Sequence, residues 1–208
     1  LRIAPKSALI FGISASTIGV FELTFLVNIY SGILSFISIV VYLFVYTPLK
    51  RVTSLNTIIG SVPGALPPVG GWVAATGDLD LKALMLFGIL FCWQIPHFLS
   101  LAIIYKDDYK RGGFKMLPSI SDDRNAITFQ ILFFTMALIY TSVGIYFVNI
   151  VSYIYVIGAI ILGLIFLFYS SVILFEYSSR TIKRIFIFSI IYLPILLLMI
   201  ILDSMFFK

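Results

Sequence analysis

Long apolar stretches alternate with short polar ones along this chain, and each apolar stretch is about as long as a bilayer is thick. A transmembrane helix needs about 20 mainly apolar residues, whereas a strand of a membrane barrel shows about ten residues of alternating character. The apolar stretches here are continuous, which predicts helices that satisfy their backbone hydrogen bonds inside lipid. We therefore predict seven transmembrane helices, at residues 7–27, 29–47, 57–76, 82–104, 126–148, 151–174 and 185–206.

The composition of the chain also indicates a protein embedded in lipid. Of its 208 residues, 61% are hydrophobic and 11% are charged, and the mean hydropathy is +1.13. A soluble globular protein has about 45–50% apolar and about 25% charged residues. No shift in composition and no repeat divides the chain, so we expect one all-α membrane domain over residues 1–208. The single cysteine, Cys92, excludes a disulfide framework or a cysteine-based zinc site within one chain.

The basic residues lie almost entirely on one side of the predicted helices. If the chain starts in the cytoplasm, all fourteen Lys and Arg residues except Lys82 and Lys208 are cytoplasmic, as the positive-inside rule requires. The net charge of +5 therefore reflects membrane orientation. A nucleic-acid-binding protein would instead gather its basic residues on a soluble face, so we expect no nucleic acid among the partners.

The first polar feature is the stretch 47–56, Thr-Pro-Leu-Lys-Arg-Val-Thr-Ser-Leu-Asn, between the second and third predicted helices. Lys50 and Arg51, with Asn56 and the next helix start behind them, would offer cationic groups and N–H donors to an anion such as a diphosphate. The alternative is that both cations are ordinary anchors of a membrane helix. Residues 60–71 contain several Gly and Pro, which predicts a kinked or partly unwound helix or, alternatively, close helix packing.

The second polar feature begins at His97, within the fourth predicted helix. Asp108 follows eleven residues later and shares nearly the same face if the helix continues that far. A neutral histidine in a membrane helix either packs with a hydrogen-bond partner or lines a polar cavity. Asp107 and Asp108 suit a magnesium ion that also binds phosphates, or else they are solvated loop residues. Asp122 and Asp123 are better explained as helix-start residues.

Several stretches taken together resemble one known family. They are residues 46–56, residues 60–72 with Gly-Ala-Leu-Pro-Pro at 64–68, Pro-His-Phe at 96–98, Lys-Asp-Asp-Tyr at 106–109, Met-Leu-Pro at 116–118 and the tail at 184–203. In composition, order and spacing they resemble the protohaem IX farnesyltransferases (haem O synthases), a branch of the UbiA-like intramembrane aromatic prenyltransferases. The resemblance covers essentially the whole chain. It implies a bundle of nine transmembrane helices around a central cavity, of which this chain supplies the last seven.

The resemblance also implies two departures from the family pattern. The superfamily has a first Asn/Asp-rich motif just upstream of a stretch like residues 1–6, and that motif is absent here. We therefore expect the chain to begin after the first two helices and that motif, and to be an inactive fragment if nothing precedes it. In the second acidic motif, Asp-x-x-x-Asp in the superfamily, Ile104 stands at the first position relative to Asp108.

The activity that the resemblance implies is transfer of a farnesyl group from farnesyl diphosphate to a vinyl group of haem b, giving haem O and diphosphate. The implied cofactor is Mg²⁺, held by Asp107 and Asp108. The candidate catalytic residues are Asp107, Asp108, Lys50 and Arg51. The candidate substrate-binding residues are Asn56, Tyr105 and Lys106 for diphosphate and His97 for haem.

Other hypotheses remain open from the sequence. They are a sister prenyltransferase acting on a quinone or chlorophyll precursor, a haem-binding or transport membrane protein, and an inactive remnant. The expected surroundings are a lipid bilayer, with haem A synthase or a terminal oxidase as possible protein partners. With no visible targeting segment, we expect a bacterial inner membrane and an active site on its cytoplasmic side.

Overall fold

The computed structural model describes residues 3–121 and 123–206, and the regular structure within them is helical. Arg2, Asp122 and Lys208 lie outside the described residues. The elements are α1 (Pro5–Glu22), η1 (Leu23–Val27), α2 (Ile29–Val40), η2 (Val41–Tyr46), α3 (Thr47–Leu49), α4 (Asn56–Thr76), α5 (Leu81–Ile104), α6 (Lys106–Arg111), α7 (Leu117–Ile120), α8 (Arg124–Gly144), α9 (Tyr153–Ser171), η3 (Val172–Leu174) and α10 (Ser179–Phe206).

Seven helices in the described part of the chain are long and apolar enough to cross a membrane, which confirms the predicted number. They are Pro5–Val27, Ile29–Leu49, Asn56–Thr76, Leu81–Ile104, Arg124–Gly144, Tyr153–Leu174 and Ser179–Phe206. The greatest difference from the prediction is at the start of α10, which begins six residues earlier than expected. The additional first turns carry basic residues, whose long side chains reach the membrane surface from a helix end.

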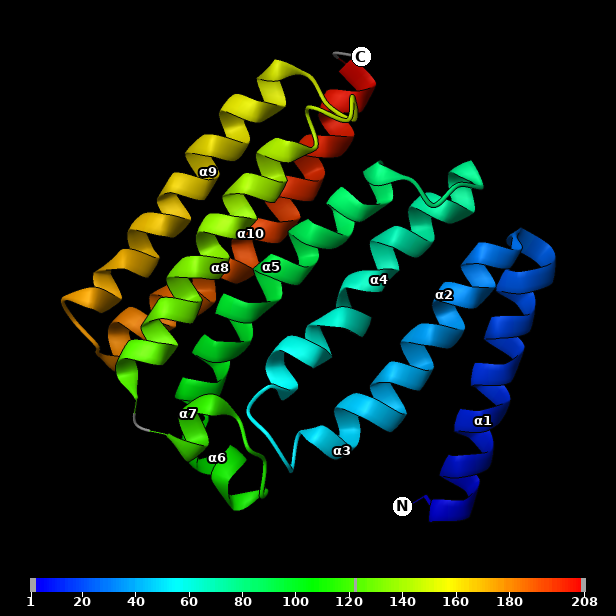
Figure 1. Ribbon diagram of the computed structural model, residues 1–208, viewed down its shortest axis with the longest axis horizontal. Helices are drawn as coiled ribbons and strands as arrows, with labels where there is room; N and C mark the ends of the chain where they lie inside the picture. The colour runs from blue at the N-terminus through cyan, green and yellow to red at the C-terminus, as the bar shows by residue number, and fades with distance from the viewer. Residues whose placement is uncertain (1–2, 122, 207–208) are drawn as a thin grey trace.

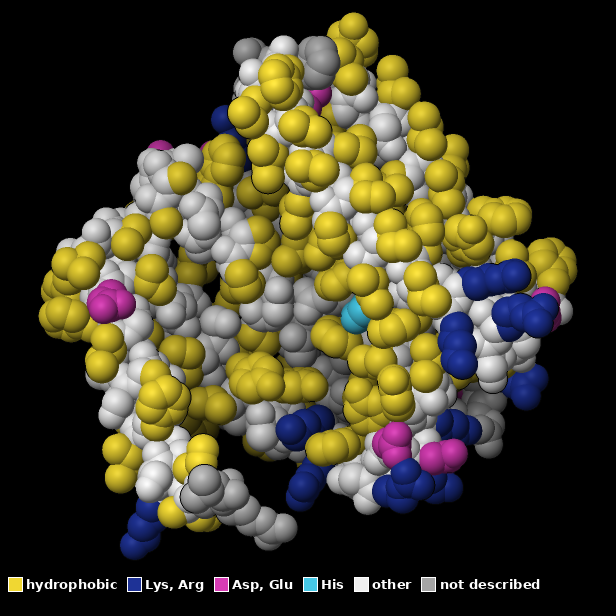
Figure 2. Space-filling view, turned by 180° about the vertical axis from the view of Figure 1, so that it is seen from behind, with side chains coloured by type: hydrophobic (Ala, Val, Ile, Leu, Met, Phe, Trp, Pro, Cys, Tyr) yellow, Lys and Arg dark blue, Asp and Glu magenta, His cyan; other side chains and the backbone are white. Residues whose placement is uncertain are grey.

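The core lies between α5, α8, α9 and α10, which pack together on one side of the molecule (Figure 1). Fully buried side chains of this core include Ile95, Ile131, Phe166 and Tyr192. On the other side α4 packs against α5, α2 packs against α4, and α1 forms the edge beside α2. No described residue of α1 is buried. The hydrophobic surface expected for contact with lipid covers much of the visible face in Figure 2.

The two ends of the bundle differ in character. The short helices α3, α6 and α7 lie together at one end, and the end of α10 lies at the other (Figure 1). At that other end Asp203 is 3% exposed and caps α9. Its carboxylate accepts hydrogen bonds from the backbone N–H of Ser152 at 2.6 Å and from that of Tyr155 at 3.3 Å. The polar loops that could bind a substrate are therefore those at the end with α3 and α6.

Partial unwinding of the third transmembrane helix is a wrong prediction. The helix α4 runs without interruption through Pro63, Pro67 and Pro68. Pro67 has no N–H for the carbonyl of Pro63, and the hydroxyl of Ser38 donates to that carbonyl at 3.5 Å instead. Neighbouring helices can thus satisfy the groups that proline leaves free. Irregular turns occur instead in the first two transmembrane helices, where η1 and η2 are π-helical.

Candidate functional site

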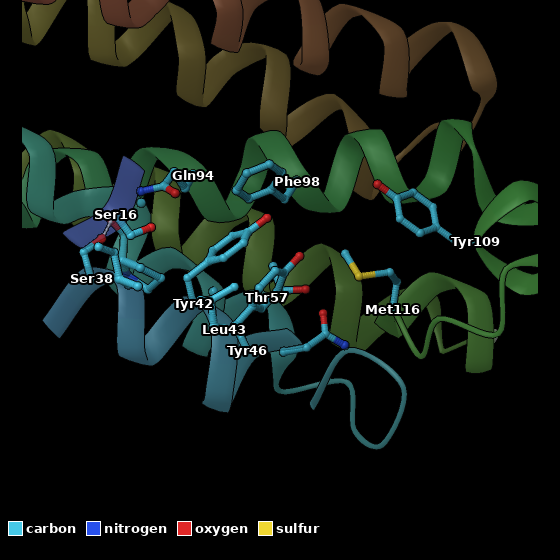
Figure 3. Close-up of a pocket in the computed structure, with 15 residues that line it drawn as sticks. Ser16, Ser38, Tyr42, Leu43, Tyr46, Thr57, Gln94, Phe98, Tyr109 and Met116 are labelled. Carbon is cyan, nitrogen blue, oxygen red and sulfur yellow. Dashed lines mark hydrogen bonds between the residues drawn. The ribbon is translucent and has the colours of Figure 1, made fainter. Parts of the chain in front are cut away.

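A cavity of about 590 Å³ opens among α1, α2, η2, α4, α5 and the α6–α7 region (Figure 3). Its lining residues are Ser16, Ser38, Ile39, Tyr42, Leu43, Tyr46, Asn56, Thr57, Gly60, Pro63, Gly64, Gln94, Phe98, Tyr109 and Met116. The molecule is visibly hollowed near its centre in Figure 2. The volume falls within the usual range of about 300–1,000 Å³ for small-molecule sites.

Two glycines of α4 make room for side chains of the cavity wall. A Cβ atom on Gly60 would lie 2.6 Å from the ring of Tyr46, and one on Gly64 would collide with the amide oxygen of Gln94. Gln94 is held in place because its Nε2 donates to the carbonyl of Ser61 at 3.4 Å. These glycines therefore let an aromatic ring and an amide approach the backbone of α4. Of the two explanations considered for the glycines of this helix, close packing is the one that applies to Gly60 and Gly64.

The wall formed by the second transmembrane helix was not predicted as part of the site. Ser38, Tyr42 and Tyr46 are spaced four residues apart and all line the cavity. The last two belong to η2, and π-helical turns are frequent at functional sites. The regular spacing of side chains with hydroxyl groups is the signal that could have identified this wall. Gln94 on α5 and Tyr109 on α6 were also missed.

Asn56 connects the two loops at the mouth of the cavity. Its Nδ2 donates to the carbonyl of Thr53 at 2.5 Å and to the carbonyl of Lys115 at 2.8 Å. The N–H of Lys115 donates in turn to the carbonyl of Lys50 at 2.8 Å. Asn56 is fully buried, and its Oδ1 has no hydrogen-bond partner within residues 3–121 and 123–206. Because backbone carbonyls occupy the amide nitrogen, only an acceptor oxygen is left for a ligand.

Two of the cationic residues predicted for the site, Lys50 and Arg51, contact the ring of Phe114. The Nζ of Lys50 lies 5.1 Å from the centre of the Phe114 ring, and the guanidinium carbon of Arg51 lies 5.9 Å from it. Such cation–π contacts fix a charged group while leaving donors free for an anion. The ring of Tyr109 packs edge-on against Phe114, with their centroids 6.2 Å apart. The loop before α4 and the helix α6 therefore meet around one aromatic ring.

Asp108 lies beside this aromatic cluster, in a smaller cavity of about 350 Å³ that Tyr105, Tyr109 and Phe114 also line. Tyr109 belongs to both cavities, so the two adjoin. Burial raises the pKa of the Tyr109 hydroxyl above its ordinary value, so the hydroxyl stays protonated at neutral pH. Asp108 forms an ion pair with Arg111, and both side chains are largely exposed.

The acidic residues alone do not form a complete metal site in the structure. Asp107 is exposed on α6. Among the described residues, no group of three or more His, Cys, Asp or Glu side chains is arranged to hold a metal ion. Mg²⁺ commonly binds through one or two carboxylates together with substrate phosphates and water. The pair Asp107 and Asp108 therefore fits a cation that arrives with a diphosphate.

The shared face of His97 and Asp108 is a wrong prediction. The helix α5 ends at Ile104, and Tyr105 has a non-helical conformation before α6 begins. The ring of His97 instead points toward α10, where its Nδ1 lies 2.8 Å from the hydroxyl of Ser189. His97 also stacks on Trp93, with ring centroids 4.9 Å apart.

Lys106 lies apart from the main cavity. It lines a different cavity, of about 150 Å³, together with Pro118, Arg124 and Tyr177. The structure therefore brings Lys50, Arg51 and Asn56 together, and it connects them through aromatic rings to Asp108 and Tyr105.

Comparison with known proteins assigns the fold and the family. The model of the UbiA prenyltransferase family matches residues 1–193. This chain belongs to the UbiA prenyltransferase family. It is a multi-pass membrane protein of that family, and its helices resemble a solved structure of a membrane digeranylgeranylglyceryl phosphate synthase. That likeness has a TM-score of 0.83 at 19% sequence identity and covers 97% of this chain and 71% of the other, so it shows the fold alone.

The relatives within the family are named protohaem IX farnesyltransferases. The protein from Salinibacter ruber is 42% identical over 202 residues, which are 97% of this chain and 71% of the relative. That from Solibacter usitatus is 39% identical over 202 residues, covering 97% and 69%. That from Orientia tsutsugamushi is 39% identical over 193 residues, covering 92% and 62%. The similarity therefore extends over all the stretches that form the candidate site.

Proposed function

We propose that this protein is a protohaem IX farnesyltransferase, which joins the farnesyl group of farnesyl diphosphate to a vinyl group of haem b and produces haem O. The observation that carries the proposal is the identity of about 40% to proteins of that name over 97% of the chain. The cavity is consistent with it. An apolar and aromatic interior suits an isoprenoid chain, and Lys50, whose Nζ lies 6.0 Å from the ring of the lining residue Tyr46, suits a diphosphate.

The diphosphate binds at the mouth in this proposal, with Lys50 and Arg51 as its cationic partners. Both groups are held against Phe114 and keep their N–H donors for phosphate oxygens. Asn56 fixes the two loops of the mouth and offers its free Oδ1 to a cation or to a donor group. Tyr105 is a further contact, because it lines the adjoining cavity with Asp108. Lys106 is proposed only as a distant contributor of positive charge.

Asp107 and Asp108 would hold Mg²⁺, which supplies positive charge to the departing diphosphate when it is bound. The residues of the chain perform the remaining tasks. Lys50 and Arg51 stabilise the negative charge that develops as the carbon–oxygen bond of farnesyl diphosphate breaks. The rings of Tyr42 and Phe98 line the cavity where the allylic cation forms, and aromatic faces stabilise a cation. The vinyl group then attacks this cation, and water adds to the resulting carbocation with loss of one proton.

His97 is the proposed contact for haem. The hydroxyl of Ser189 donates to the carbonyl of Phe186 at 2.6 Å, so it accepts a hydrogen bond from the Nδ1–H of His97. This bond favours the tautomer in which Nε2 carries the lone pair. A neutral imidazole nitrogen of this kind is a suitable ligand for iron.

The proposed location is a bacterial inner membrane, with the mouth of the cavity on the cytoplasmic side. The distribution of Lys and Arg supports this orientation, because the loops with Lys50 and with α6 carry several basic residues, whereas the loop between α4 and α5 on the other side carries none. Haem A synthase and a terminal oxidase are the proposed protein partners, as users of the product.

The experiment that tests the acidic site replaces Asp108 with Asn in the protein expressed from its complete gene. We expect haem O formation to fall at least tenfold, while membrane insertion stays unchanged because Asp108 is exposed and its ion pair contributes less than about 1 kcal/mol. The matched control is Asp78→Asn, an exposed residue on the loop between α4 and α5. Equal product from Asp108→Asn and the control would remove Asp108 from the site.

A further inference from the structure

Two buried oxygens at the start of α4 have no hydrogen-bond partner among the residues that the structure describes. They are Oδ1 of Asn56, which is fully buried, and Oγ1 of Thr57, which is 5% exposed. The polar atoms of a buried residue are normally paired, because an unpaired one loses its hydration without compensation. Both residues line the main cavity. Unpaired polar atoms in a cavity wall are the pattern expected where a ligand completes the hydrogen bonding.

The surroundings of these oxygens define the chemistry of the ligand. The N-cap residue of α4, Leu55, makes no side-chain capping hydrogen bond in the described part of the chain, and a helix N-terminus carries positive partial charge. The hydroxyl of Thr57 can donate a hydrogen bond. Asn56 can offer a ligand only its acceptor Oδ1, because its amide nitrogen already donates to two carbonyls. Lys50, in the loop that Asn56 ties down, adds a full positive charge. A ligand that matches this set has an anionic oxygen for Thr57 and a cation for Asn56.

We propose that Thr57 extends the diphosphate site to a subsite at the N-terminus of α4, with its hydroxyl as a direct ligand contact beside Asn56. The Thr57 hydroxyl donates to a diphosphate oxygen, next to the acceptor Oδ1 of Asn56. This inference rests on the proposed function and adds Thr57 as a direct ligand contact. Met116 lies near Thr57 in the cavity wall (Figure 3). Its unbranched side chain can move aside to admit the diphosphate.

The Thr57→Val variant tests this subsite because it removes the hydroxyl and keeps the shape of the side chain. Without ligand, the variant should be at least as stable as the wild type, since an unpaired buried hydroxyl is replaced by a methyl group. With Mg²⁺ and inorganic pyrophosphate, it should bind about tenfold or more weakly, because a hydrogen bond to a charged group is lost. Binding is measured by calorimetry and by thermal stabilisation of the purified protein in detergent.

Thr135→Val is the matched control, since Thr135 is also fully buried but bonds to the carbonyl of Ile131 at 2.7 Å. It should be less stable than the wild type and bind Mg²⁺–pyrophosphate with unchanged affinity. Unchanged pyrophosphate affinity in Thr57→Val would overturn the inference. So would a Thr57→Val protein that loses stability as Thr135→Val does, because the hydroxyl would then have a partner within the protein.

The experiments distinguish a failure of the Thr57 subsite from a failure of the proposed farnesyl transfer to haem. Normal haem O formation together with unchanged pyrophosphate binding in Thr57→Val would refute the subsite and leave the proposed reaction intact. The opposite result is also possible: Thr57→Val binds pyrophosphate more weakly, but the wild type forms no haem O. That result would support the subsite and refute haem b as the acceptor.

Discussion

The substitution Asn56→Asp tests the connection between the two loops at the cavity mouth. It exchanges the amide nitrogen, which donates to the carbonyls of Thr53 and Lys115, for an oxygen of nearly the same size. Two neutral hydrogen bonds contribute about 0.5–1.5 kcal/mol each. An ionised carboxylate in this fully buried position would face two carbonyl oxygens, so its pKa should rise and a proton would be taken up.

The expected loss of unfolding free energy is about 2–4 kcal/mol at neutral pH. A protonated Asp can restore only one of the two hydrogen bonds, and each unit of pKa shift costs about 1.36 kcal/mol above that pKa. Because the folded-state pKa is raised, the stability of the variant falls as the pH rises through that value. The difference from the wild type should therefore narrow as the pH is lowered from 8 to 5.

The assay combines reversible unfolding in detergent with hydrogen exchange of the loop after α6. The N–H of Lys115 donates to the carbonyl of Lys50, so its protection reports whether the loops remain joined. Asn125→Asp is the matched control, an exposed residue in the first turn of α8 that should change stability by less than about 0.5 kcal/mol. An Asn56→Asp protein as stable and as protected as this control would refute the reasoning.

Two further substitutions test the cavity wall and the opposite end of the bundle. Gly60→Ala should displace the ring of Tyr46 and cost about 1–3 kcal/mol of packing, with weaker binding of farnesyl diphosphate. The control Gly71→Ala lies on the same helix, where the added methyl group has no described atom within 4 Å, and it should stabilise the protein by up to about 1 kcal/mol. Equal changes in melting temperature for the two alanine variants would contradict the role of Gly60. Asp203→Asn should cost about 2–4 kcal/mol, because it weakens charge-assisted bonds to the N–H and hydroxyl of Ser152. An unfolding free energy of Asp203→Asn equal to that of the wild type would show that this cap of α9 contributes little to stability.

The number and approximate limits of the transmembrane helices followed from the sequence because apolar length is a strong signal in a bilayer. Local departures from regular helix did not follow from it. The π-helical turns η1 and η2 contain neither Gly nor Pro, so no residue of the usual helix-breaking kind marks the change. The break at Tyr105 separates α5 from α6 without a Gly or Pro at that residue. The effect of proline in α4 was misread, since the helix continues and the hydroxyl of Ser38 on α2 donates to the Pro63 carbonyl that Pro67 leaves free.

Part of the candidate site could be predicted because its members are close in sequence. Lys50 and Arg51 precede α4 closely, and Asn56 is its first residue; the structure places both cations against Phe114, and Asn56 lines the main cavity. The hydrogen bonds of Asn56 could not be predicted, since its Nδ2 donates to Thr53 nearby and also to Lys115, which is 59 residues away in the sequence. The side chain of Gln94 enters the wall only because α4 has a glycine opposite to it. Such contacts depend on tertiary packing rather than on local pattern.

The most direct measurement of the central claim is product analysis in membranes that contain this protein, expressed from its complete gene in cells lacking their own haem O synthase. The membranes are supplied with haem b, farnesyl diphosphate and Mg²⁺, and the extracted haems are separated and identified by mass spectrometry. We predict a haem that carries one farnesyl group and one added water, formed only when farnesyl diphosphate is present. Unmodified haem b, with or without a prenylated quinone precursor in the same extract, would contradict the account.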